Sequence, residues 1–201
     1  TAERLKKYFQ LFIDARQKLA DLRGEDLRLL ETEEVNFEDE SCNTQGKSAE
    51  ERIWIFKKKV DTYESEGLVI RGIDECNKML SLNPNLYLAW YKKGRLHQKA
   101  REIARSLCCF DQCTKIDPRA TDPYHQKALI FTSQMRFSDA IPMYDKILGI
   151  DANNFDAIIG KARCLYKLNK PYTEWISRAK KISKKRTEEL MKEYGMEKAV
   201  I

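Results

Sequence analysis

The sequence predicts an all-α protein built from a stack of similar helical hairpins, and three observations favour this fold class. Among the 201 residues only 8 are glycine and 5 are proline, while good helix formers are abundant. Pro84 and Pro118 lie 34 residues apart, and so do Trp90 and Tyr124. Within each period the apolar residues follow helical spacing. A fixed period in this range is typical of stacked repeats, in which each unit buries its apolar face against the next.

The first helix of each repeat is predicted from frames of 34 residues that begin at Ile53, Tyr87, Thr121 and Phe155. Repeat positions 4, 8 and 11 share one helical face and alternate bulky, small and bulky side chains, which lets a second helix approach at the small position. In the four frames these positions hold Phe56, Val60 and Tyr63; Trp90, Gly94 and His97; Tyr124, Ala128 and Phe131; and Ile158, Ala162 and Leu165.

The second helix has the same spacing at repeat positions 20, 24 and 27. These positions hold Gly72, Cys76 and Met79; Ser106, Phe110 and Cys113; and Ala140, Tyr144 and Ile147. Asn83-Pro84 and Asp117-Pro118 separate successive repeats, because the residue before a proline disfavours the helical conformation.

This pattern resembles the tetratricopeptide repeat (TPR) over about residues 50–170. The third frame is the most similar. Two residues depart from the family pattern: Cys76, in the first frame, replaces an aromatic residue, and Ala152, in the third, replaces the proline. The resemblance implies a right-handed superhelical solenoid of stacked helix-turn-helix repeats with a concave groove and with extra helices at its ends. We assign the repeats to residues 50–171, as units 53–86, 87–120 and 121–154 and a half repeat 155–171.

The two ends of the chain depart from the repeat. Residues 1–30 predict an amphipathic helix with the apolar stripe Leu5, Tyr8, Phe9, Phe12, Leu19 and Leu22. Residues 31–49 read as an acidic and polar linker. Residues 172–195 predict one basic C-terminal capping helix that buries Trp175, Ile176, Ala179 and Ile182 against the last repeat. Its other face carries a basic patch of Lys180, Lys181, Lys184, Lys185 and Arg186.

In the resembled family, repeat positions 2, 5, 9 and 12 line the concave groove. The partner-binding residues expected from this rule are Tyr91, Arg95, Gln98, His125, Leu129, Thr132, Ile159, Arg163 and Tyr166. Arginines beside aromatic rings suit a ligand with carboxylates, so we expect a protein or peptide partner that is acidic or of mixed charge. The alternative is that these residues are ordinary solvated or inter-repeat side chains.

Chaperone-binding TPR domains carry a dicarboxylate clamp of lysine, asparagine and arginine. With the frame from Tyr87 taken as the first repeat, the clamp positions hold Tyr91, Arg95, Gln126, Asp156 and Gly160. We therefore expect no clamp of this kind.

Repeat position 7 holds a lysine in every frame, Lys59, Lys93, Lys127 and Lys161. We expect their stems to lie along the packed face rather than to form a nucleic-acid stripe.

No arrangement of residues predicts an enzyme, a metal site or a cofactor. The glycines form no phosphate-binding loop, and the 6 cysteines include no CxxC pair, with only 2 histidines to complete a site. Reduced thiols are typical of the cytosol, so we expect a cytoplasmic protein. No apolar run approaches the roughly 20 residues of a membrane span, and the first residues do not resemble a secretory signal.

The sequence therefore predicts a non-enzymatic adaptor that holds a peptide or helix of a partner in the groove. Two alternatives stay open. The first is a nucleic-acid-associated repeat protein that uses the basic patch, which the net charge of +6 favours and the following Glu188 and Glu189 oppose. The second is a self-associating subunit of a homo-oligomer, joined through the N-terminal apolar stripe or an exposed end of the solenoid.

Overall fold

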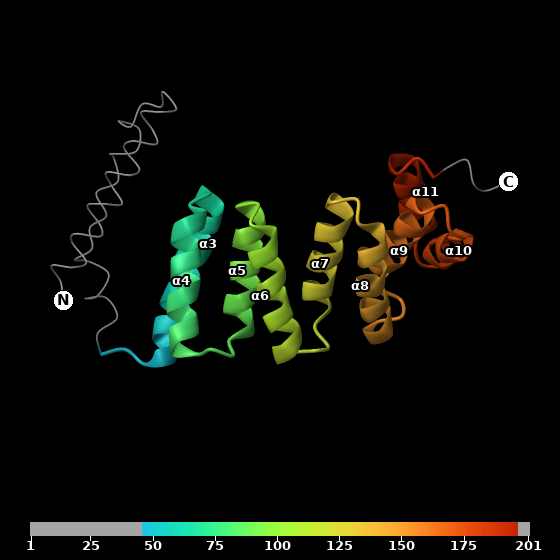
Figure 1. Ribbon diagram of the computed structural model, residues 1–201. Helices are drawn as coiled ribbons and strands as arrows, with labels where there is room; N and C mark the ends of the chain where they lie inside the picture. The colour runs from blue at the N-terminus through green and yellow to red at the C-terminus, as the bar shows by residue number, and fades with distance from the viewer. Residues whose placement is uncertain (1–45, 197–201) are drawn as a thin grey trace, which may run out of the picture. The chain divides into compact units, whose positions relative to one another are not determined.

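The computed structural model describes residues 46–196, and within this range every regular element is an α-helix. The expected helix at 1–30 and residues 31–45 of the expected linker lie outside the described residues. The described helices belong to one compact unit that begins at Ser48. Figure 1 shows them as successive antiparallel pairs that lie side by side. The all-α solenoid predicted from the sequence is confirmed.

The helices pair in chain order. They are α3 (Ala49–Glu66) with α4 (Val69–Leu82), α5 (Tyr87–Lys99) with α6 (Ile103–Ile116), α7 (Thr121–Ser133) with α8 (Phe137–Ile150), and α9 (Phe155–Lys167) with α10 (Thr173–Ile182), followed by α11 (Lys184–Glu193). The starts of α5, α7 and α9 coincide with the starts of the expected frames. Helix α3 begins one turn before its frame, because Ser48 and Glu51 form a capping box there.

Small residues bring the two helices of a hairpin together. A Cβ atom added to Gly94 in α5 would lie 2.8 Å from Cε1 of Phe110 in α6, and this phenyl ring is fully buried. Ser106, at the small position that begins the packed face of α6, donates a 2.8 Å hydrogen bond to the carbonyl of Gly94. The bulky-small-bulky pattern therefore sets the distance between the helices.

A left-handed residue ends the first helix of every pair. Gly67, Arg101, Met135 and Asn169 have φ of 77°, 60°, 59° and 53° and recur at the 34-residue period. In each turn the next backbone N–H donates to a carbonyl five residues earlier, for example Leu68 to Tyr63, which satisfies the helix end. Gly67 and Asn169 are residue types that adopt this conformation readily, whereas Arg101 and Met135 adopt it at a cost of about 1–2 kcal/mol each.

The C-terminal segment differs from the single helix that we expected for residues 172–195. It forms α10 and α11, because Ser183 is extended with φ of −151° and ψ of 98°. Ile182, the last residue of α10 before this break, is 45% exposed instead of buried. Residues from both helices, Ile176 and Met191 among them, enter one apolar cluster with α9. The break at Ser183 therefore returns α11 towards α9.

Candidate functional site

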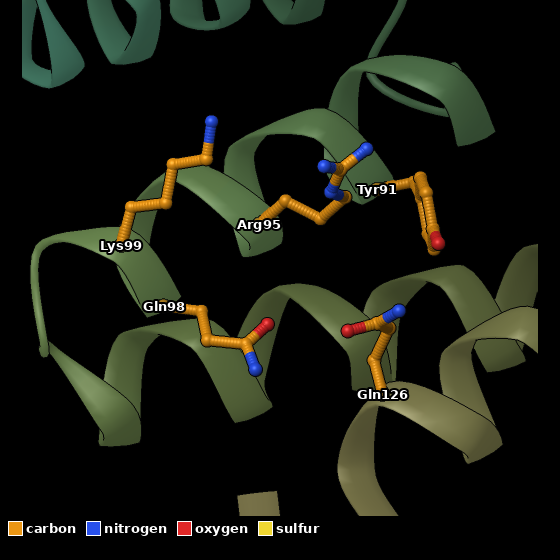
Figure 2. A pocket seen from close by; sticks show the side chains of 5 residues that line it. All are labelled: Tyr91, Arg95, Gln98, Lys99 and Gln126. Atoms are coloured by element: carbon orange, nitrogen blue, oxygen red, sulfur yellow. The ribbon is translucent and has the colours of Figure 1, made fainter. Parts of the chain in front are cut away.

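Three groove positions of α5 border a cavity of about 420 Å³, to which α7 contributes one residue beside its own groove positions. Its lining residues are Tyr91, Arg95, Gln98, Lys99 and Gln126. Figure 2 shows the side chains of Tyr91, Arg95, Gln98 and Lys99 on α5 and that of Gln126 on α7, with the Gln98 and Gln126 amides pointing towards each other. The groove rule anticipated the first three residues. It missed Lys99 and Gln126, which occupy repeat positions 13 and 6, next to positions 12 and 5 on the same helical face.

Tyr91 is held in place by its ring contacts. It stacks on Tyr87 with 6.1 Å between ring centroids and 7° between ring planes, and it meets Phe110 at 5.8 Å. Burial, and then the charge of Asp122, raises the pKa of the Tyr91 phenol, so the hydroxyl stays protonated and can donate a hydrogen bond. A fixed aromatic ring with a polar end is a typical interface anchor.

Arg95 is fixed by an ion-pair network between α3 and α5. Glu64 accepts ion pairs from Lys92 at 2.9 Å, Arg95 at 2.9 Å and Lys99 at 3.3 Å. Lys92 also pairs with Asp61 at 2.9 Å, and Asp61 pairs with Lys57 at 3.1 Å. Four cations thus share two carboxylates, which leaves excess positive charge at the cavity. The Arg95 side chain is still 40% exposed.

The network also sets the protonation of Glu64. Burial opposes its charge, but the hydrogen bond and charge of Lys92, with further help from Arg95 and Lys99, outweigh burial and lower the pKa of Glu64. The carboxylate is therefore ionised at neutral pH and holds Arg95 in position without neutralising the surrounding lysines.

The groove positions of α7 are less polar. Leu129 is exposed, and the Thr132 hydroxyl donates to the Leu129 carbonyl at 2.9 Å, so it is satisfied within its own helix. The His125 ring meets the edge of Tyr144 at 6.4 Å. Of these three residues, Leu129 alone presents an exposed apolar side chain.

The groove positions of α9 are covered, in contrast to the open surface that we expected there. Ile159 is only 5% exposed and belongs to the cluster that contains Met191 and Met196. The Arg163 guanidinium lies 4.3 Å from the centroid of the Tyr194 ring. The Tyr166 hydroxyl donates to the Gly195 carbonyl at 2.8 Å.

An ion pair completes this cover. Asp156, at repeat position 2 of α9, accepts from Arg186 of α11 at 2.7 Å. The Arg186 guanidinium also lies 4.4 Å from the centroid of the Phe155 ring. Helix α11 and the three residues after it therefore occupy the groove face of the last repeat.

The basic patch is divided between two helices. Lys180 and Lys181 end α10, whereas Lys184, Lys185 and Arg186 form the first turn of α11. Arg186 is exposed but pairs with Asp156, and Lys180 is half-buried, so Lys181, Lys184 and Lys185 are the exposed lysines of the patch.

The cysteines of the described range are packing residues, apart from the exposed Cys108. Burial raises the pKa of Cys76 and Cys113 to about 12 and that of Cys109 and Cys164 to about 11, which keeps these thiols protonated. Between residues 46 and 196 no three histidine, cysteine, aspartate or glutamate side chains gather in a way that could hold a metal ion. No helix of this range is long and apolar enough to cross a membrane.

No family model matches the sequence. Among curated proteins, the chain is similar to the transcription factor tau 131 kDa subunit of Saccharomyces cerevisiae, with 24% identity over 107 residues. The match covers 53% of this chain and 10% of the yeast protein, so the chain spans a small part of that relative.

Solved structures show the fold more clearly. One similar structure is that of the protein MamA, with a TM-score of 0.60 and 18% identity, and with 75% of this chain and 85% of that chain covered. The first TPR of Spaghetti (RPAP3), solved with the HSP90 peptide SRMEEVD, has a TM-score of 0.54 and 16% identity, and the match covers 59% of this chain and 94% of that chain. YrrB, described as a TPR protein with an unusual peptide-binding site, has a TM-score of 0.55 and 12% identity, and the match covers 72% of this chain and 73% of that chain. The chain therefore has the TPR fold, a solenoid of stacked helical hairpins.

Proposed function

We propose that this chain is a non-enzymatic adaptor that holds a peptide or helix of a partner protein against α5 and α7. One observation carries the proposal. The groove face of α5 is open and lined by Tyr91, Arg95 and Gln98, whereas the same repeat positions of α9 are already covered by α11 and residues 194–196 of the chain itself. The intramolecular helix α11 is a guide to the kind of occupant that this face accepts.

The matched positions suggest how a ligand would sit. Repeat position 9 is arginine in both helices, and the Arg163 guanidinium lies over the ring of Tyr194. An aromatic side chain of a partner would stack on Arg95 in the same way. The excess positive charge around Glu64 favours acidic groups beside that aromatic residue. Because Tyr91 and Arg95 are already fixed, binding orders mainly the ligand, which lowers its entropic cost.

The comparisons support protein binding in general. Two proteins of similar fold are described as binding peptides, the RPAP3 domain and YrrB. The fold also occurs in an O-GlcNAc transferase of Thermobaculum terrenum, with a TM-score of 0.51 over 60% of this chain but only 23% of that chain. We assign this chain to the scaffold group because its described residues offer a binding surface and no paired catalytic groups.

Affinity purification with matched variants tests the proposal. The full chain, the double variant Tyr91→Ala/Arg95→Ala and the control Lys146→Ala, which changes an exposed cation on α8, are each used to capture partners quantitatively. We expect the double variant to lose at least about tenfold of a partner that the control retains, since anchor residues contribute about 1.4 kcal/mol or more. A double variant that melts like the wild type and keeps every partner would contradict the proposal.

A nucleic-acid function remains the second candidate, because Lys181, Lys184 and Lys185 are exposed and the yeast relative is a transcription factor subunit. Changing these three lysines to glutamine should then weaken binding of a duplex in a shift assay, with a shallower salt dependence. Unchanged binding by the triple variant removes this candidate. Self-association is the third candidate function. It predicts that light scattering gives a molecular mass above that of a monomer.

A further inference from the structure

A lysine–aspartate pair joins successive repeats on the side of the first helices that faces away from the groove. Lys127 of α7 binds Asp111 of α6 at 2.5 Å, and Lys161 of α9 binds Asp145 of α8 at 2.5 Å. Both lysine side chains are only 15% exposed. At these two junctions the lysine at repeat position 7 therefore pairs with a carboxylate at position 25 of the preceding repeat.

The junction between α4 and α5 lacks this pair. Lys93 occupies repeat position 7 there, but position 25 of the preceding repeat holds Asn77, which carries no charge. No carboxylate between residues 46 and 196 forms an ion pair with Lys93. Its ammonium lies 5.2 Å from the centroid of the Trp90 ring instead.

A cleft of about 340 Å³ lies at this junction, which we term the outer cleft. It is lined by Ile73 and Asn77 of α4, by Trp90, Lys93 and His97 of α5, and by Arg105, Cys108 and Cys109 of α6. The Trp90 indole is oriented by a 2.8 Å hydrogen bond from Nε1 to the Pro84 carbonyl. The cleft thus combines a fixed aromatic ring, an apolar wall and the ammonium of Lys93.

A second cation borders the outer cleft. The Arg105 side chain is 70% exposed and pairs with Glu102 at 3.1 Å, and Glu102 also lies 2.6 Å from Nδ1 of His97. Glu102 is thus engaged by Arg105 and His97, and Lys93 is left to meet an external anion. On a helix of 100° per residue, Lys93 lies about 160–200° from Tyr91 and Arg95, so the outer cleft and the groove cavity use opposite sides of α5.

We propose that the outer cleft is a second binding site, which takes an aspartate or glutamate side chain of a partner protein segment. The partner carboxylate binds the Lys93 ammonium, as Asp111 and Asp145 bind the equivalent lysines in the next two junctions. A neighbouring apolar side chain of the segment packs on Trp90 and Ile73. The amide of Asn77 leaves the lysine charge available and can donate a hydrogen bond to the same carboxylate.

Asn77→Asp is the decisive variant, because it is nearly isosteric and supplies the pair that the other two junctions contain. The probe is a blocked hexapeptide with two aspartates and two leucines, and its matched control carries asparagines instead. Binding to the ¹⁵N-labelled full chain is followed at the indole N–H resonance of Trp90, which Trp90→Phe identifies.

We expect the acidic peptide to shift this resonance with saturation, and the asparagine peptide to leave it unmoved. Asn77→Asp and Lys93→Gln should each weaken binding at least tenfold, while Arg95→Ala in the groove should leave it unchanged. This last arm separates the outer cleft from the proposed groove function. Equal binding by wild type and Lys93→Gln, or equal binding of both peptides, would overturn the proposal. So would a shift produced by inorganic phosphate but not by the acidic peptide.

Discussion

The groove faces of α5 and α9 occupy equivalent repeat positions, but the face of α5 is open and the face of α9 is covered. The face of α5 borders a cavity, with Tyr91 and Arg95 fixed but accessible. The face of α9 is filled by α11, which takes Ile159 into the apolar core and places Tyr194 on Arg163. Equivalent repeat positions therefore do not have equivalent roles. In a solenoid each repeat contacts only its neighbours, so an added helix changes the last repeat and leaves the middle ones free.

The largest expected effect comes from removing the apolar anchor of α11. Met191 is buried, and we expect Met191→Ala to cost about 2–5 kcal/mol in the free energy of unfolding, with faster amide exchange throughout α11. Met135→Ala, at an exposed methionine, is the control and should be nearly neutral. If α11 keeps its protection in the Met191 variant, the comparison between the covered and open faces loses its basis.

The next variant tests the hairpin that supports the open face. Gly94→Leu places side-chain atoms where Phe110 already lies within 2.8 Å of a Cβ, so overpacking should cost about 1–3 kcal/mol in thermal unfolding. Gly149→Ala is the matched control, because nothing lies within 4 Å of its added Cβ. It should stabilise the protein by roughly 0.5–1 kcal/mol. Equal melting temperatures of the two variants would contradict the close packing of Gly94 against the Phe110 ring.

A smaller effect is expected from the network that holds Arg95. Glu64→Gln should cost on the order of 1 kcal/mol at neutral pH. Because the pKa of Glu64 is lowered on folding from its usual 4.5, this stability is present above that value and is lost as the pH falls through the folded-state pKa. Chemical denaturation across this pH range should show the wild type and the variant converging in acid. A constant difference would contradict the role given to the charge of Glu64.

The smallest effect concerns the ion pair on the covered face. Arg186 and Asp156 are both more than half exposed, so Arg186→Gln should cost only about 0.2–1 kcal/mol. Amide exchange at the start of α11 should rise slightly, and high salt should reduce the difference from wild type. A loss comparable to that of Met191→Ala would mean that charge, rather than apolar packing, holds α11 on α9.

The repeat was predictable because each 34-residue frame gives several independent signals, such as the small residue at Gly94 beside the bulky Trp90 and His97. The return of α11 was not predictable. Ile176, Ala179, Thr187 and Met191 would also form one stripe on an uninterrupted helix, and Ser183 carries no proline or glycine signal for a break. The covered state of Ile159 follows from that break, so the groove rule could not anticipate it.

The sequence contains a signal for the outer cleft, which lies in the residues at repeat position 25. Aligning repeat position 25 gives Asn77, Asp111 and Asp145, and the exception becomes meaningful only when it is paired with position 7. The sequence identifies the residues at repeat positions 7 and 25, but it does not show that the two positions meet across a junction between repeats. The left-handed turns at Arg101 and Met135 are a similar case, since the fold imposes them on residues that do not favour them.

A photo-crosslinking residue placed at repeat position 12 tests the difference between the two faces most directly. It is introduced in the full chain at Gln98, on the open face of α5, or at Tyr166, on the covered face of α9. We predict that Gln98 captures a partner protein, and that Tyr166 yields only an internal link to the segment around Gly195. Capture of the same partner from Tyr166, or an internal link alone from Gln98, would contradict the account.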